Sequence, residues 1–375
     1  MKQMVVLSAV PWYPQPARIQ QIVSRLPQTR VLYFDPPPQE RPKKKKAGGA
    51  EGEQSDAILQ AGEFITILPL PAVPPGETRR AFRRQGRKLA RFIRRAMAKY
   101  EFQEDSVIWC CAPAAADILP HIPHGPVIYD ASYDNMLRDA GSGLLKALER
   151  ELCARADLIL VPAEEKKAAL DAASRPVRLL PGGANFNLFS TAGKEDLPFP
   201  DELFAVKNPI IGYIGGIDAG TDLTYIEAAA RLHPEWSFVL VGPVSETADA
   251  KPVENLPNVH MLGFRPHKLL PRYLSRFDVC VNPARYREDS ASPLKLYEYL
   301  ATGKPIVSTP HPRQVLDYTE VISIAGTHNE FTECCAKGIR EHDAWRTRQR
   351  INYGKAASWD ARVQELLRIF TETGI

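Results

Sequence analysis

The chain has 375 residues, enough for two domains of roughly 100–200 residues each, and its 44% hydrophobic and 25% charged content is typical of soluble globular proteins. The formal net charge of only +4 gives no overall reason to expect a nucleic-acid partner. No apolar stretch approaches the roughly 20 residues that span a bilayer, and the run before Pro11 is too short for a signal peptide.

The front half alternates short β-rich runs with helical spacing. Expected strands are Met4–Val10, Arg30–Phe34, Ser106–Cys111, Val127–Tyr129 and Asp157–Val161, with a helix at Ile19–Leu26 and a strand pair or edge at Ile58–Leu70. Residues 36–57 hold PPP, KKKK and AGGAEGEQ, which cannot bury enough surface to become ordered, so they predict a mobile surface loop. The alternation favours parallel sheets flanked by helices.

Residues 78–99 predict a basic amphipathic helix, because ten Lys or Arg residues and no acid accompany apolar residues at helical spacing. One interpretation is contact with an anionic membrane surface through Arg83, Arg87, Arg91 and Arg94. Each basic residue near such a surface is worth about 1 kcal/mol, and the KKKK run would add to this attraction. The other, compatible interpretation is an apolar stripe packed on the sheet with a solvated basic back.

The back half repeats a strand, a glycine and a helix, a pattern typical of a doubly wound α/β domain. A linker rich in proline and charge precedes it, near 191–207. The expected strands are Pro209–Ile214, Ser237–Val241, Val259–Leu262, Asp278–Asn282 and Pro305–Ser308. The expected helices are Tyr225–Leu232, Leu269–Arg276 and Leu294–Thr302, the last ended by Gly303.

The six cysteines lack the C-x-x-C and C-x-x-H spacings of zinc sites. We therefore expect no metal site, and reduced, mostly buried thiols in a reducing compartment.

The segment from Ser290 to Pro305 carries the clearest candidate site. Ser292 is predicted as the N-cap and Pro293 as the first helical residue, which leaves backbone N–H groups free to bind an anion. Lys295 lies in the first turn, where a cation gains nothing from the helix dipole, so a diphosphate is expected beside it. Glu298 lies one turn on, where it could bind a ribose diol; the alternative is an exposed Lys295–Glu298 salt bridge. The predicted donor-binding residues here are Ser292, Leu294, Lys295 and Glu298.

Three further segments follow apolar strands of the back half. Gly215 and Gly216 would let a ligand approach the backbone closely, and Gly242 ends the next strand. Phe264 and Arg265 follow a third strand and could stack on or hydrogen-bond a base. Because ligands bind at the carboxyl ends of strands in such sheets, these segments are predicted to converge on a nucleotide. The alternative for each residue is an ordinary loop position.

In the front half, Asp130 and Asp134 follow the strand Val127–Tyr129. Acids at the carboxyl end of a strand would face the cleft between the domains, so either is a candidate general base for an acceptor hydroxyl. The alternative is that each carboxylate caps the following helix.

The string SPLKLYEYLATGKPIVST resembles the donor-site helix of bacterial glycosyltransferases of the GT-B architecture, and is most similar to the GT4-like (group 1) teichuronic-acid and capsule transferases. LPGGANFNLFS resembles that family's segment at the domain junction, and NPIIGYIGG, WSFVLVGP, NVHMLGF and LPRYLSRFDVCVNP follow in the family's order. PWYPQPARIQQIVSRL and TRVLYFDPP are similar to its first βα unit. The resemblance covers nearly all of the chain.

This resemblance implies an α/β fold of GT-B type, with two Rossmann-like doubly wound domains and an interdomain cleft. Residues 1–190 would bind the acceptor and 205–355 the nucleotide sugar, while 356–375 would form a helix packing back on the first domain. Lys295 and the helix N-terminus match the groups that neutralise the leaving diphosphate without a metal, and Glu298 matches the ribose-binding carboxylate.

The implied activity is transfer of a hexose-type sugar from a nucleoside-diphosphate sugar to a lipid-linked or cell-envelope glycan acceptor. The implied location is cytoplasmic, peripheral on the inner face of the cytoplasmic membrane. Two other functions stay open: a nucleotide-sugar epimerase of the same architecture, and a non-catalytic scaffold in envelope polysaccharide assembly.

The sequence departs from the family pattern in two places. The frequent E-x7-E pattern would place its first Glu at Ser290, so Glu288, Asp289 or Ser290 is expected to contact the sugar instead. The usual basic pair after the glycines of the first back-domain strand is missing, and Asp218 and Asp222 stand in that stretch.

Overall fold

The computed structural model describes residues 2–13, 17–37, 59–73, 78–132, 143–170, 175–193, 197–286 and 293–375. The chain divides into an N-terminal unit, Met1–Leu180 with Val363–Ile375, and a C-terminal unit, Pro181–Arg362. The sequence predicts domains at 1–190 and 205–355 and a returning helix at 356–375. Five predicted site residues lie outside the described residues: Asp134, Glu288, Asp289, Ser290 and Ser292. Residues 38–57 of the predicted loop also lie outside them.

In the described part of the chain, the N-terminal unit has an eight-stranded sheet in the order β3-β4-β2-β1-β5-β6-β7-β8. Its strands are β1 (Lys2–Leu7), β2 (Thr29–Asp35), β3 (Leu59–Gln60), β4 (Ile65–Pro69), β5 (Val107–Cys110), β6 (Val127–Asp130), β7 (Leu158–Val161) and β8 (Val177–Leu179). Neighbouring strands are parallel except β3 and β4. The strand pair expected within Ile58–Leu70 is confirmed at this edge.

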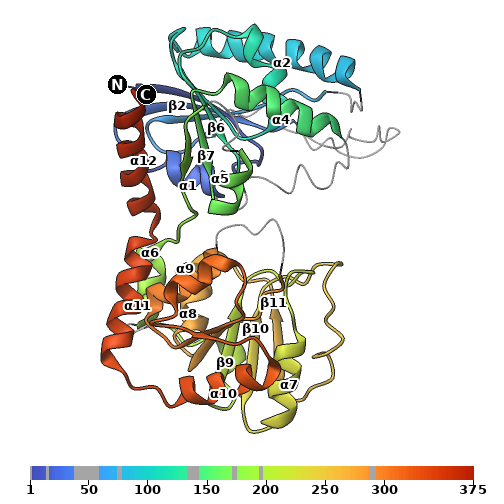
Figure 1. Cartoon of the computed structure of the whole chain (residues 1–375), viewed down its shortest axis with the longest axis vertical. Helices are drawn as coiled ribbons and strands as arrows, with labels where there is room; N and C mark the ends of the chain where they lie inside the picture. Colours follow the sequence, from blue (N-terminus) through green and yellow to red (C-terminus); the bar gives the residue numbers. More distant parts are fainter. Residues whose placement is uncertain are drawn as a thin grey trace. The chain divides into compact units, whose positions relative to one another are not determined.

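The helices of this unit are α1 (Arg18–Val23), α2 (Arg79–Lys99), α4 (Gly143–Arg155), α5 (Glu164–Leu170) and the end of α12 (Trp359–Thr373). Alternate strand residues serve the two faces of the sheet. Leu7 and Phe34 share a core with α2 and α4, which lie together on one side of the sheet (Figure 1). Trp109 of β5 meets Phe370 of α12 with ring centroids 6.3 Å apart. Helices α4 and α5 and strand β8 are absent from the sequence predictions.

Helix α2 is anchored in the core along one face. Leu89, Ile93 and Met97 are buried there, and a methyl group on Gly86 would overlap the backbone carbonyl of Asp117 in the short 3₁₀ helix η1 (Pro113–Asp117). The interpretation of a core-facing helix with a solvated basic back is therefore confirmed.

In the described residues, the C-terminal unit has a six-stranded parallel sheet in the order β11-β10-β9-β12-β13-β14. Its strands are β9 (Ile210–Ile214), β10 (Ser237–Val241), β11 (Val259–Gly263), β12 (Val279–Asn282), β13 (Ile306–Ser308) and β14 (Ser323–Ile324). Its helices are α6 (Phe186–Phe189), α7 (Thr224–Leu232), α8 (Leu270–Leu274), α9 (Leu294–Thr302), α10 (His328–Ile339), α11 (Ala344–Ala356) and the start of α12.

The four central strands β10, β9, β12 and β13 are buried on both faces, whereas the edge strands β11 and β14 are half-buried. Ile214 and Cys280 share a core with α6, α8 and α9, whereas Tyr213 and Val281 share a second core with α7 and α10 (Figure 1). Two helical layers on one parallel sheet make a doubly wound domain. All the strands and helices that the sequence predicts here are present, and α6, α10, α11 and β14 are additional.

Among the described helices, none combines the length and the hydropathy of a membrane-spanning segment. All six cysteines are free, and Cys334 alone among them is not fully buried.

Candidate functional site

The carboxyl end of β9 is the switch point of the C-terminal sheet, with β10 on one side and β12 on the other. The pairing of β9 with β12 covers Ile211 and Gly212. Toward the carboxyl ends of the two strands, the hydroxyl of buried Tyr299 on α9 bridges their backbones. It accepts a hydrogen bond from the Ile214 N–H at 2.9 Å and donates one to the Val281 carbonyl at 3.2 Å. The tyrosine therefore fixes α9 at the position where open α/β sheets bind ligands.

The predicted glycines of β9 and β10 meet at this edge. A methyl group on Gly242 would overlap the carbonyl of Gly215, so the two backbones touch. Gly242 also donates its N–H to the Gly263 carbonyl at 2.9 Å, which brings in the end of β11. Gly215 has φ +123°, a conformation that favours glycine, while Gly216 has open space beside it. The backbone of Gly216 is thus exposed to a ligand at this edge.

The N-terminus of α9 opens onto the same edge. The structure places Pro293 at the N-cap position, where no side chain caps the helix, rather than at the first helical position that the sequence predicts. A proline φ near −65° suits either position, so the sequence pattern does not separate them. Pro293 has no side-chain acceptor for the first backbone N–H groups of α9, so these groups can donate hydrogen bonds to an anion.

Lys295 extends from the first turn of α9 across Gly215. Its ammonium group donates to the Tyr213 hydroxyl, lies 4.4 Å from the centre of the Tyr213 ring and is 3.4 Å from the Gly216 carbonyl. A methyl group on Gly215 would overlap this side chain. Within the described residues no carboxylate pairs with Lys295, so its charge is available to an anionic ligand.

Glu298 pairs with a residue that the sequence analysis missed. Its Oε1 accepts a hydrogen bond from His267 Nε2 at 2.9 Å, and its side chain is only 15% exposed. The His267 ring packs edge-on against Phe189 of α6 with centroids 5.0 Å apart. The predicted alternative, a salt bridge between Glu298 and Lys295, is therefore wrong. The available signal was the position of His267 shortly after a strand end on the same sheet edge.

The remaining donor candidates differ in their surroundings. Phe264 and Leu294 are exposed, as a stacking or contact surface requires. Arg265 already has partners: its guanidinium group pairs with Glu202 at 2.7 Å and donates to the Tyr273 hydroxyl at 3.0 Å. The hydrogen bond to Tyr273, followed by that to Glu202, raises the pKa of Arg265. The described contacts tie Arg265 to its own unit.

The two acids that replace the usual basic pair serve local structure. Asp218 accepts the Gly220 N–H at 2.8 Å, and Asp222 accepts the Thr224 N–H at 3.2 Å at the start of α7. Arg285 lies 3.4 Å from Asp222. Among the described residues, no three His, Cys, Asp or Glu side chains are grouped as metal ligands.

In the N-terminal unit, Asp130 ends β6 and is fully buried. Its Oδ2 accepts a hydrogen bond from Arg18 Nε at 3.0 Å, and its Oδ1 accepts one from the Ser132 hydroxyl. Both carboxylate oxygens are thus held by neighbours at the carboxyl end of the strand, where the sequence predicts a general base.

Part of the C-terminal unit matches a known protein family. Residues 208–340 match the family model of the glycosyl transferases group 1. The glycosyltransferase TuaH of Bacillus subtilis is 28% identical over 268 residues. Its role in teichuronic acid biosynthesis has been assigned provisionally. That match covers 64% of this chain, which spans about two thirds (66%) of the length of the curated relative.

Solved structures match over almost the whole chain. An Escherichia coli trehalose-6-phosphate protein bound to UDP-2-fluoro glucose has a TM-score of 0.71 at 13% identity, with 98% of both chains covered. A UDP-forming trehalose-phosphate synthase from Burkholderia xenovorans in complex with glucose-6-phosphate has a TM-score of 0.69 at 12% identity, with 99% of this chain and 100% of that chain covered. HepE from Anabaena, in complex with UDP and glucose, has a TM-score of 0.65 at 15% identity, with 99% of both chains covered.

These matches confirm the fold class and the resemblance that the sequence analysis inferred. The chain has the GT-B fold of two Rossmann-like α/β domains, and its residues 208–340 are similar to the glycosyl transferases group 1.

Proposed function

We propose that the protein is a glycosyltransferase that moves a sugar from a nucleoside-diphosphate sugar to a lipid-linked or cell-envelope glycan acceptor. The observation that carries this proposal is the placing of Lys295 over Gly215, beside the N-terminus of α9, which Pro293 leaves uncapped, and at the switch point of the sheet. A fixed ammonium group and oriented backbone N–H groups suit the charge that develops on a leaving diphosphate.

The donor would lie along the strand ends of the C-terminal unit. Its diphosphate would contact Lys295 and the first N–H groups of α9, next to the exposed backbone of Gly216. Its ribose diol would bind Glu298, whose free oxygen is complementary to two hydroxyl donors, and Phe264 would stack on the base. This placing is supported by the exposure of Phe264 and by the bound UDP or UDP sugar in two structural relatives.

His267 would act as a positioning residue for the ribose. Its hydrogen bond occupies one oxygen of Glu298 and fixes the orientation of the carboxylate, while Phe189 fixes the histidine ring. A carboxylate with one oxygen held by an imidazole retains its other oxygen for the ligand.

For acceptor activation we propose Asp130 or Asp134, with no metal. Both oxygens of Asp130 already accept hydrogen bonds, so as a base it would have to exchange the Ser132 hydroxyl for the acceptor hydroxyl. For the sugar we propose contacts from Glu288, Asp289 or Ser290, at the positions that the family pattern indicates.

The nature of the acceptor is supported by two observations. The curated relative is named for teichuronic acid biosynthesis, and helix α2 carries an exposed basic face through Arg83, Arg87, Arg91 and Arg94. That face would attach the protein peripherally to the inner, anionic face of the cytoplasmic membrane.

Calorimetry on the full chain tests the proposal. Titration with UDP, GDP, ADP and CDP should reveal binding of at least one of them, and a labelled sugar nucleotide of the same base should release nucleoside diphosphate when acceptor is added. Binding of none of the four would favour the scaffold, and a changed sugar without release of diphosphate would favour the epimerase.

A further inference from the structure

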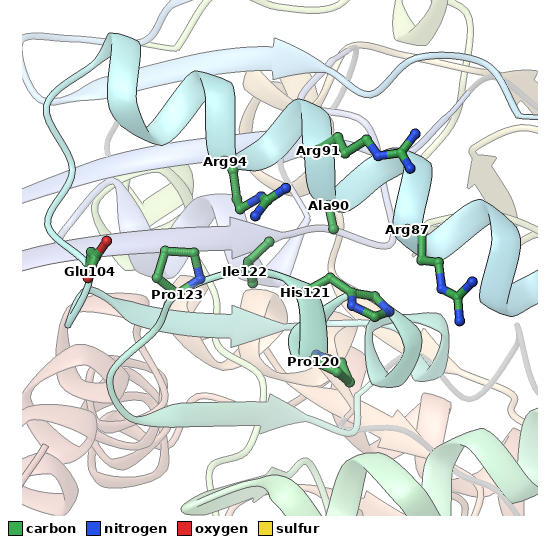
Figure 2. A pocket seen from close by; sticks show the side chains of 9 residues that line it. All are labelled: Arg87, Ala90, Arg91, Arg94, Glu104, Pro120, His121, Ile122 and Pro123. Carbon is green, nitrogen blue, oxygen red and sulfur yellow. The ribbon is translucent and has the colours of Figure 1, made fainter.

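A groove of about 710 Å³ runs along one side of α2 in the N-terminal unit, outside the donor site. Arg87, Arg91 and Arg94 line one edge, and the segment Pro120–Pro123, which carries His121, lines the other (Figure 2). The three arginines are four and three residues apart, so they lie within about 60° of one another around the helix.

The charge of this groove is uncompensated. In the part of the chain that the structure describes, no ion pair joins Arg87, Arg91 or Arg94 to a carboxylate, although Arg79 on the same helix pairs with Asp117 and Glu151. Glu104 lines the groove as well, but lies beyond ion-pair distance of the three arginines. Three guanidinium groups therefore share a concave surface with a single acid among its described lining residues.

The scaffold that presents these groups is rigid. Ala90 and Ile122 form buried parts of the lining, at 1% and 7% exposure, and both belong to the core of the unit. The contact of Gly86 with the backbone of Asp117 holds α2 close to the segment that carries His121. Side chains on such a scaffold can form a defined site rather than a diffuse basic surface.

We propose that this groove binds a phosphate group, and that the phosphate is the headgroup of an anionic membrane lipid. Guanidinium groups bind phosphate through two parallel N–H donors, and Arg at i, i+4 and i+7 presents three such pairs to one ligand. The lipid assignment rests on the membrane-associated function proposed above. The phosphate site itself does not, because the same groups would bind a soluble phosphate ester.

A matched pair of variants separates this site from general attraction. The groove variant is Arg87→Gln with Arg91→Gln and Arg94→Gln. The control variant is Arg84→Gln with Arg95→Gln and Lys99→Gln, which removes the same charge from exposed positions roughly 80° further round α2. Both are measured in the full chain by co-sedimentation with vesicles of phosphatidylcholine, with and without phosphatidylglycerol.

We expect the groove variant to lose at least tenfold more affinity for the phosphatidylglycerol vesicles than the control variant. Equal losses would overturn the proposal, because diffuse electrostatics depends on charge and not on position. Titration with inorganic pyrophosphate, with the Lys295 site blocked by the Lys295→Met substitution, distinguishes the source. Loss of the remaining pyrophosphate binding in the groove variant, with vesicle binding unchanged, would support the phosphate site but assign it to a soluble ligand.

Two further measurements keep the test independent of folding and of the donor site. Replacing the same three arginines with lysine retains the charge but not the paired donors, so phosphate binding should still fall in a chain whose thermal unfolding is unchanged. Nucleoside-diphosphate binding should be the same in all variants. Its absence from the unmodified protein would refute the transferase proposal without bearing on the groove.

Discussion

Replacement of Lys295 with methionine tests the donor site most directly. Methionine keeps most of the aliphatic stem over Gly215 but removes the ammonium group, which now contacts the Tyr213 hydroxyl and lies 3.4 Å from the Gly216 carbonyl. Both present contacts are to uncharged groups, so the ammonium group can turn toward a phosphate at little cost. A hydrogen bond to a charged group contributes about 1.5–3 kcal/mol, and we take about 2 because Lys295 is partly solvated.

At 1.4 kcal/mol for each factor of ten, this predicts a loss of about 30-fold in affinity for the nucleoside diphosphate. Calorimetry with the diphosphate and with the parent nucleoside measures it, and the nucleoside should bind with unchanged affinity. Lys355→Met, at an exposed position of α11, is the charge-matched control and should have no effect on either ligand. A diphosphate affinity within twofold of the original, or an equal loss for the nucleoside, would refute the placing of the diphosphate beside Lys295.

Three other substitutions examine the rest of the proposed machinery. Glu298→Gln should reduce the preference for a nucleoside diphosphate over its 2′,3′-dideoxy form, measured by calorimetry, because an amide replaces the carboxylate that receives the diol; an unchanged preference argues against ribose binding there. Tyr299→Phe should lower the free energy of unfolding, measured in urea, by about 1–3 kcal/mol, because the buried Ile214 N–H loses its hydrogen-bond acceptor. A change below about 0.5 kcal/mol would mean that another group accepts a hydrogen bond from this N–H. Asp130→Asn should reduce turnover while donor affinity is retained; thermal unfolding is recorded beside it because the ion pair with Arg18 is weakened, and full turnover in the folded variant would remove Asp130 as the base.

The sequence predicted the C-terminal sheet well because glycine and proline mark its boundaries. Gly303, for example, adopts the left-handed conformation that ends α9, and the helix spans Leu294–Thr302 as the spacing predicts. Helices α4 and α5 were missed because packing on the sheet, rather than a strong local pattern, stabilises them.

The site was predicted in part. Local position brought the glycines and Lys295 to one edge, because parallel strands end at a common edge of the sheet. Position after a strand end also brings His267 to this edge, but it does not show that His267 pairs with Glu298 or that Glu202 pairs with Arg265. Those contacts depend on side-chain directions that only tertiary packing decides.

The buried tyrosine of α9 has a consequence for how this fold can vary. Tyr299 is adjacent in sequence to Glu298 and one turn from Lys295. Its hydroxyl links β9 and β12 by hydrogen bonds where the two strands no longer pair directly. Tyr299 thereby fixes the register of α9 on the sheet. A shift of α9 by a single residue would break these hydrogen bonds and move both proposed ligand-binding groups away from the glycines. Substitutions that alter ligand preference are therefore expected at positions outside α9, with the helix itself kept in register.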